Sequence, residues 1–106
     1  MNVFLDDKRR CPSVYMPARS ADECIRLIKS GSIDTLSLDY NLGRGNPTGY
    51  TVVEYMTDHR TYPRRIIIHS ASPSGRARMY RHLKKHKPSG VQLLIRPRPS
   101  ARGAAK

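Results

Sequence analysis

Four short apolar runs of this chain each end in polar side chains that are suited to metal or phosphate chemistry. The runs are Val3–Leu5, Leu36–Leu38, Ile66–Ile68 and Leu93–Ile95. The polar side chains that follow them are, in chain order, Asp6, Asp7, Asp39, His69, Ser70 and Arg96. Parallel strands point their carboxyl ends the same way, so residues just past those ends can meet in one crevice. If the runs are neighbouring parallel strands, we expect these groups to converge.

The three carboxylates predict a site for Mg²⁺ or Mn²⁺. Mg²⁺ prefers hard oxygen ligands and usually takes one or two carboxylates together with phosphate oxygens. Held close together without a cation, Asp6, Asp7 and Asp39 would repel one another and their pKa values would rise. The alternative is that Asp6 and Asp7 only end a strand at the surface.

Two interpretations of Asp39 stay open from the sequence. As a nucleophile it would form an aspartyl-phosphate, a known covalent strategy. As a metal ligand it would have no covalent role. Ser70 is a candidate donor to a phosphate oxygen, and Arg96 could hold a phosphate through two parallel hydrogen bonds. Otherwise Ser70 is an ordinary strand-end serine and Arg96 is one more cation of a basic region.

His69 is a candidate general acid or base, because the unperturbed pKa of histidine lies near neutrality. The alternative is a buried histidine that is hydrogen-bonded to backbone. In a regular strand His69 points to the face opposite Ser70, which favours the second interpretation.

The net charge of +12 is distributed unevenly along the 106 residues. Residues 1–58 hold seven basic and all eight acidic side chains, whereas residues 59–106 hold thirteen basic and no acidic ones. Such a field attracts nucleic acid, a phosphorylated ligand or an acidic protein. The alternative is an ordinary solvated helix face. The densest basic stretch comprises Arg76, Arg78, Arg81, Lys84, Lys85 and Lys87.

Hydrophobic patterning predicts alternating strands and helices. Strands are expected at 2–6, 34–39, 64–70 and 91–95, and residues 14–18 form at best an edge strand, antiparallel or irregular. Helices are expected between Ser20 and Gly31, over 50–60, and from Pro73 to about residue 85. This alternation is typical of a parallel sheet covered by helices.

The predicted domain spans residues 1–97, and residues 98–106 are expected to form a basic, disordered tail. No apolar run approaches the ~20 residues that a membrane helix needs. Asp6 and Asp7 interrupt the only apolar stretch near the N-terminus, so no secretory signal is expected. The sequence is therefore typical of a cytoplasmic protein.

Together these motifs resemble the receiver domain of two-component response regulators. The resemblance covers about residues 2–97, with Asp6-Asp7 as the metal-binding pair and Asp39 as the phosphoacceptor. Thr48-Gly49-Tyr50, Ser70-Ala71 and Arg96-Pro97 stand at the positions of further receiver motifs, although receivers carry lysine where Arg96 stands. The resemblance also implies that the backbone carbonyl of Asn41 completes the metal site.

The sequence is most similar to the compact variant described as a cyclic-phosphate-processing receiver domain. That resemblance implies a flavodoxin-like α/β three-layer sandwich with a mostly parallel sheet of four to five strands, lacking the first and last receiver helices. It also implies a divalent-metal-dependent, phosphohydrolase-like activity on a cyclic phosphate or an RNA end.

Two alternatives remain at this point. One is a non-catalytic basic module, such as a virus-encoded one, that binds nucleic acid or an acidic host protein. The other is a phospho-accepting signalling receiver, which the arginine at position 96 and the missing last helix disfavour.

Overall fold

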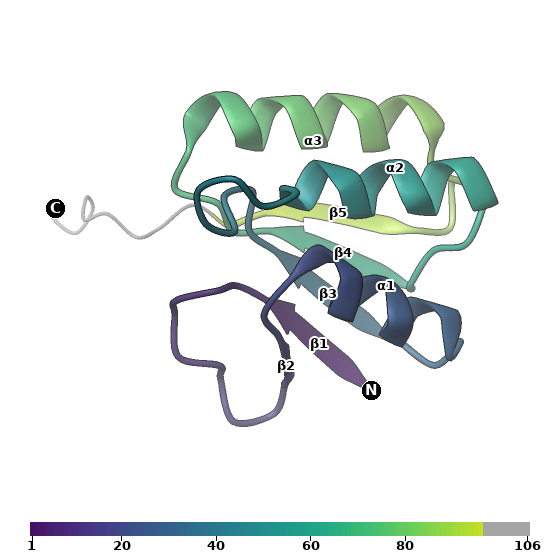
Figure 1. The fold of residues 1–106 in the computed structure, drawn as a ribbon. Coiled ribbons are helices and arrows are strands. Elements are labelled where there is room, and N and C mark those ends of the chain that lie inside the picture. Colours follow the sequence, from purple (N-terminus) through teal and green to yellow (C-terminus); the bar gives the residue numbers. More distant parts are fainter. Residues whose placement is uncertain (97–106) are drawn as a thin grey trace, which may run out of the picture.

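A computed structural model describes residues 1–96 of the chain as one sheet and one layer of helices. The sheet has five strands, all parallel, in the order β2-β1-β3-β4-β5 (Figure 1). The receiver-like α/β sandwich expected from the sequence is confirmed. The strands are β1 (Asn2–Leu5), β2 (Met16–Ala18), β3 (Thr35–Leu38), β4 (Arg65–Ile68) and β5 (Gln92–Ile95), and the helices are α1 (Ala21–Lys29), α2 (Gly49–His59) and α3 (Pro73–His86).

Local signals in the sequence place the helix ends. The Ser20 hydroxyl caps α1 by accepting a hydrogen bond from the Glu23 N–H at 3.1 Å. The Ser72 hydroxyl caps α3 in the same way, accepting from the Gly75 N–H at 3.1 Å. Gly31 follows α1 with φ +83°, a left-handed conformation that favours glycine.

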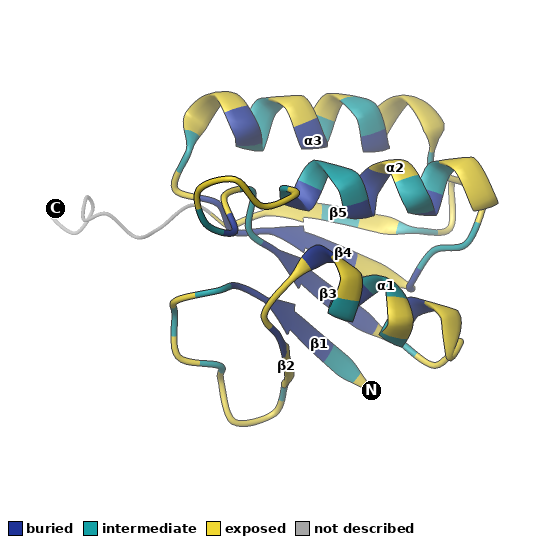
Figure 2. Ribbon diagram, viewed as in Figure 1, coloured by how far each residue is buried: buried dark blue, intermediate teal, exposed yellow. Residues whose placement is uncertain are grey.

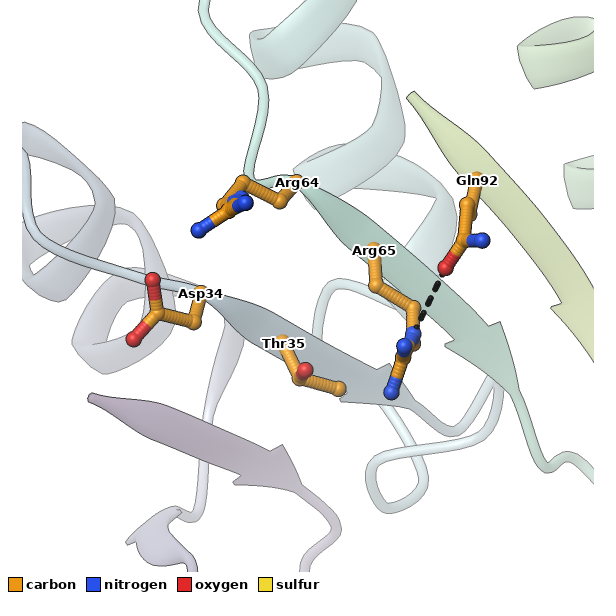
Figure 3. Close-up of a pocket in the computed structure, with 5 residues that line it drawn as sticks. All are labelled: Asp34, Thr35, Arg64, Arg65 and Gln92. Carbon is orange, nitrogen blue, oxygen red and sulfur yellow. Dashed lines mark hydrogen bonds between the residues drawn. The ribbon is translucent and has the colours of Figure 1, made fainter. Parts of the chain in front are cut away.

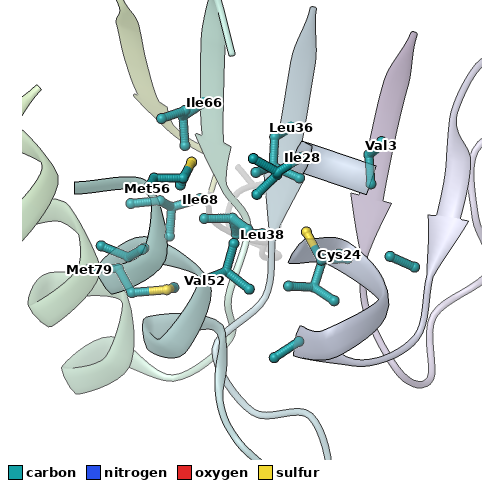
Figure 4. Close-up of a cluster of buried hydrophobic side chains, with 14 of the residues drawn as sticks. Val3, Cys24, Ile28, Leu36, Leu38, Val52, Met56, Ile66, Ile68 and Met79 are labelled. Atoms are coloured by element: carbon teal, nitrogen blue, oxygen red, sulfur yellow. The ribbon is translucent and has the colours of Figure 1, made fainter. Parts of the chain in front are cut away.

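The hydrophobic core lies between the helices and one face of the sheet (Figure 4). Alternate residues of the central strands point into it because side chains alternate between the two faces of a strand. Figure 2 shows the resulting pattern: the central strands β1, β3 and β4 are largely buried, the edge strands β2 and β5 are largely exposed, and the outer sides of the helices are exposed. The strand residues of this core are Val3, Leu5, Leu36, Leu38, Ile66 and Ile68, and the helices contribute Cys24, Ile28, Val52, Val53, Met56, Met79 and Leu83.

Residues 1–96 therefore form two layers, and not the three that the sequence analysis expected. The helix α2 contacts both α1 and α3, so all three helices share one layer. The opposite face of the sheet carries Phe4, Ser37 and Ile67, and no described helix covers it. The expected absence of the first receiver helix accounts for this, since the segment between β1 and β2 contains no helix. The expected absence of the last helix and the tail at 98–106 fall outside the described residues.

The edge strand β2 corrects one expectation. Residues 14–18 were expected to be antiparallel or irregular, because the link from the first strand is too short for a helical crossover. The strand is instead parallel to β1, with Phe4 beside Pro17. An irregular loop returns the chain to the start of the sheet, so no helix is needed. Arg19 holds this loop, since its Nη1 donates to the backbone oxygens of Asp6 at 3.0 Å and Arg9 at 2.9 Å.

No helix in the described part of the chain is long and apolar enough to cross a membrane.

Candidate functional site

A cleft of about 430 Å³ opens at the carboxyl ends of β1 and β3. These strands are hydrogen-bonded neighbours, with Leu5 beside Leu38, so the residues that follow them are brought together as the sequence predicted. The start of α3 closes another side of the cleft. The lining residues are Asp6, Asp7, Lys8, Arg9, Asp39, Asn41, Gly43, Arg44, Ala71 and Ser72.

Asp6 lies at the floor of the site with its side chain only 1% exposed. Its Oδ1 accepts hydrogen bonds from the backbone N–H groups of Lys8 at 2.9 Å and Arg9 at 2.8 Å. Burial alone would raise the pKa of Asp6, but these two N–H groups and the nearby His69 bring it below its usual value. Asp6 is therefore ionised at neutral pH and held in one orientation.

The ring of His69 lies behind Asp6 and links it to Ser37. Its Nε2 is 3.0 Å from Asp6 Oδ2, and its Nδ1 is 2.7 Å from the Ser37 hydroxyl. The ring also stacks on Phe4, with centroids 4.5 Å apart. Burial lowers the pKa of His69, although Asp6 and Asp39 partly oppose this, so the ring is neutral at neutral pH. A carboxylate only accepts, so Nε2 donates to Asp6 and Nδ1 accepts from the Ser37 hydroxyl.

In this arrangement both ring nitrogens of His69 are hydrogen-bonded, and Nε2 holds the side chain of Asp6. The bonds go to the side chains of Asp6 and Ser37, whereas the sequence analysis weighed a catalytic role against bonds to backbone. Sequence reasoning missed Ser37 as part of the site. Its signal is a hydroxyl in the middle of an otherwise apolar, buried strand, where polar groups need partners.

Asp39 is half-buried beside Asp6 and faces the cleft. Burial raises its pKa and the charge of Asp6 raises it further, against the Tyr40 backbone N–H that bonds its Oδ1 at 2.8 Å. The Ser70 hydroxyl also favours the ionised form of Asp39. Two adjacent carboxylates with a raised pKa on one of them form a place where positive charge is favourable.

The donor set of the cleft fits a hard divalent cation. Ligand atoms of Asp6, Asp39 and His69 lie within 4.8 Å of one another. Because both nitrogens of His69 are engaged, the available donors are oxygens, which suits Mg²⁺ or Mn²⁺. Asp7 and Asn41 line the same cleft and supply further oxygens at its edge. The expected metal-ligand residues are thus brought together in one place.

A basic rim surrounds this acidic floor. Lys8, Arg9 and Arg44 line the cleft beside the three carboxylates. Arg9 also approaches the floor, with its Nε 3.9 Å from Asp6 Oδ2. The sequence gives no signal for these cations, because they lie in the loops after β1 and β3, where no spacing rule marks them. An acidic floor with a basic rim suits a cation that is bound together with an anionic group.

Gly49 lets the loop after Asp39 pass close to α2. Its N–H donates to the Tyr40 carbonyl at 2.8 Å, and a Cβ added there would overlap the Asp39 carbonyl oxygen. Thr48 caps the helix, its hydroxyl accepting from the Tyr50 N–H at 3.2 Å. The Thr48-Gly49-Tyr50 motif therefore packs against the backbone of Asp39 and Tyr40 and fixes the position of Asp39.

Carboxylates at the ends of β1 and β3 in a five-stranded parallel sheet are the arrangement that the sequence resemblance implied. The family model of the cyclic-phosphate processing receiver domain matches residues 1–85. This chain belongs to that family. No curated protein matches the chain significantly, and no solved structure does.

Other residues of this receiver domain lie at varying distances from the cleft. Ser70 is fully buried beside it and accepts a hydrogen bond from the Ser72 N–H at 3.1 Å. Arg96 is exposed and does not line the cleft, since it follows the edge strand β5, separated by β4 from the strands that carry the carboxylates. The phosphate contact expected of Arg96 stays a prediction.

A second pocket of about 430 Å³ lies at the opposite end of the sheet of this receiver domain (Figure 3). It is lined by Asp34, Thr35, Arg64, Arg65 and Gln92. Asp34 pairs with the N-terminal ammonium group at 3.2 Å, and Arg65 Nε donates to the Gln92 side chain at 2.9 Å. None of the predicted site residues lies there, so chemistry and not size marks the carboxyl-end cleft as the functional site.

Proposed function

We propose that this domain binds a divalent cation through Asp6 and Asp39 and processes a phosphate ester, with a cyclic phosphate as the reacting group. The observation that carries the proposal is the pair of adjacent carboxylates under a basic rim. Membership of the cyclic-phosphate processing family supports the choice of reacting group.

In the proposed mechanism, different residues of the chain would bind the cation and the phosphate. Mg²⁺, when bound, would neutralise the carboxylates and polarise a phosphate oxygen. Asp6 is held by two backbone N–H groups and His69, and would present a fixed carboxylate to the cation. Lys8, Arg9 and Arg44 would attract the phosphate and offset its charge.

A direct test monitors the hydrolysis of a nucleoside 2′,3′-cyclic phosphate by ³¹P NMR, in the presence and in the absence of Mg²⁺. We expect turnover that needs Mg²⁺ and is lost in Asp39→Asn. Asp34→Asn is the matched control, because Asp34 is an exposed acid of the other pocket. Equal turnover in wild type and Asp39→Asn would contradict the proposal.

Acceptance of a phosphoryl group on Asp39 is the second candidate function. The position of Asp39 directly after β3, in the cleft, favours it. Incubation with a small acyl phosphate and intact-mass spectrometry would show the added phosphoryl group on wild type and not on Asp39→Asn.

A further inference from the structure

The two edges of the sheet, β2 and β5, differ in whether they can accept another strand (Figure 1). In β2 the Ala18 carbonyl accepts a hydrogen bond from the Asp6 N–H at 3.0 Å, so Ala18 faces β1 and Pro17 takes the outward position. Proline has no N–H and blocks pairing along a strand edge. The β2 edge is therefore closed to a further strand.

The edge of β5 carries no such block. The N–H groups of Gln92 and Arg96 donate to carbonyl oxygens at the two ends of β4, at 3.0 Å and 2.8 Å. Successive residues of a parallel strand bond to alternate sides, so the backbone groups of Leu93 and Ile95 point outward. Among residues 1–96, no other backbone group bonds these outward N–H groups. The β5 edge thus offers hydrogen-bond donors and acceptors to a further strand.

The side chains make the same edge apolar. Leu93 packs at the margin of the core, so Leu94 points to the opposite face of the sheet. Leu94 and Ile95 are both exposed, and no charged residue stands between Lys87 and Arg96. Natural edge strands are usually protected by lysine, proline or a bulge, so an open apolar edge is typical of a site for strand addition.

One side of α3 overlooks this edge. The side that faces α2 is marked by His82, whose ring nitrogens lie 3.2 Å from the Tyr50 hydroxyl and 3.0 Å from the Thr57 hydroxyl. Because α3 packs on α2 and on β5, its opposite side lies over the outer edge of the sheet. At 3.6 residues per turn, the residues on that side are Arg76, Tyr80, Lys84 and Lys87.

The cations on this side of α3 have no counter-charge within residues 1–96. No carboxylate of that part of the chain forms an ion pair with Arg76, Lys84 or Lys87. The open edge of β5 is therefore bordered by positive charge. The other cations of the basic stretch lie elsewhere on the helix, and they are Arg78, Arg81 and Lys85.

We propose that the edge of β5 binds an extended acidic segment of a partner protein as an added strand. Alternate side chains of such a segment point to opposite faces of the sheet, so apolar ones would lie beside Leu94 and carboxylates beside Lys84 and Lys87. A second copy of this chain is disfavoured, because each copy carries a net charge of +12 and no acidic residue after Asp58. The proposal does not depend on the chemistry of the cleft.

The test is fluorescence anisotropy with a labelled peptide of four Glu-Val repeats. Its control peptide has four Glu-Pro repeats, which keep the charge but cannot pair as a strand. The test variant of the full chain is Lys84→Gln with Lys87→Gln. The matched control variant is Arg81→Gln with Lys85→Gln, which removes two exposed cations from the part of α3 nearer to α2.

We expect wild type and the control variant to bind the Glu-Val peptide equally well. The test variant should bind it about fivefold more weakly, because two exposed ion pairs are lost. The Glu-Pro peptide should bind wild type at least about tenfold more weakly, because it makes no backbone hydrogen bonds to β5. Equal binding of the two peptides, or equal losses in the two variants, would overturn the proposal. Equal competition by an oligonucleotide of the same charge would also overturn it and assign the cations to nucleic acid.

Amide hydrogen exchange of wild type locates the added strand without any substitution. The Glu-Val peptide should slow exchange of the outward amides of Leu93 and Ile95 by at least about tenfold. The amide of Leu94 points to β4 and should exchange as before. Unchanged exchange at Leu93 and Ile95 with the peptide bound would overturn the proposal.

Discussion

The two ends of the sheet carry pockets of equal volume, about 430 Å³ each, and very different chemistry. At the amino ends of the strands, Asp34 is neutralised by the N-terminal ammonium group and Arg65 bonds Gln92. At the carboxyl ends, burial and the charge of Asp6 raise the pKa of Asp39, while backbone N–H groups hold Asp6 ionised. Of these two ends, only the carboxyl end gathers several carboxylates, and that end is where a cation is favourable.

The largest effect is expected from adding a methyl group at Gly49, where it would displace the loop that follows Asp39 at the carboxyl end of the sheet. In Gly49→Ala the new Cβ overlaps the backbone oxygen of Asp39, which cannot rotate away as a side chain would. We expect a loss of about 3 kcal/mol in the free energy of unfolding, measured by urea denaturation. Gly90→Ala is the control, since a Cβ there meets nothing within 4 Å. Equal stability of the two variants would show that the loop is not packed as described.

Removing the Ser37 hydroxyl tests how the floor of the cleft is organised. In Ser37→Ala the Nδ1 of His69 loses its donor, so the ring is free to move its proton to Nδ1 and stop donating to Asp6. We expect about tenfold weaker Mn²⁺ binding, the usual cost of losing a group that orients a metal ligand.

The ring ¹⁵N chemical shifts of His69 in metal-free protein report the tautomer directly. Ser37→Thr keeps a hydroxyl and should restore both the shifts and the Mn²⁺ affinity. Wild-type shifts that already show a proton on Nδ1 would contradict the assigned hydrogen bonds.

A smaller effect is expected on the stability of the metal-free protein. Because the folded-state pKa of Asp39 lies above its ordinary value of 3.8, the folded state binds more protons than the unfolded state just above that pH. The free energy of unfolding therefore falls as pH rises through this window. Asp39→Asn should melt a few degrees above wild type at pH 7 without metal, with the advantage vanishing towards pH 3.8.

Added Mg²⁺ should reverse this order by stabilising wild type alone. The shift of Asp6 has the opposite sign, so its contribution is lost only as pH falls below 3.8. An Asp39→Asn variant that melts below wild type at pH 7 without metal would contradict the like-charge interpretation.

The smallest effect belongs to the other end of the sheet. In Arg65→Gln an exposed side chain loses one hydrogen bond to Gln92, so stability should change by less than about 0.5 kcal/mol. Mn²⁺ affinity should not change. A clear loss of Mn²⁺ binding in this variant would contradict the claim that only the carboxyl end of the sheet binds the metal.

The sequence predicts the framework because its local signals are strong. Apolar runs mark the strands, and Ser20 and Ser72 each cap a helix where their spacing indicates. The convergence of Asp6 with Asp39 follows from parallel strands alone. The parallel direction of β2 was not predictable, because a short irregular loop held by Arg19 replaces the expected helical crossover.

The directions of the side chains at the site could not be predicted from the sequence. The bonds of His69 to Ser37 and Asp6 depend on contacts between three separate strands. Strand alternation alone placed His69 on the far face of the sheet and did not show that its ring reaches Asp6. That Arg96 does not line the cleft likewise depends on the order of the strands, which residue spacing does not give.

The most direct test of the central claim is a Mn²⁺ titration followed by electron paramagnetic resonance. We expect wild type and the Asp34→Asn control to bind one Mn²⁺, and both Asp6→Asn and Asp39→Asn to lose that binding. No binding in wild type, or unchanged binding in Asp39→Asn, would contradict the assignment of a divalent-cation site to the carboxyl end of the sheet.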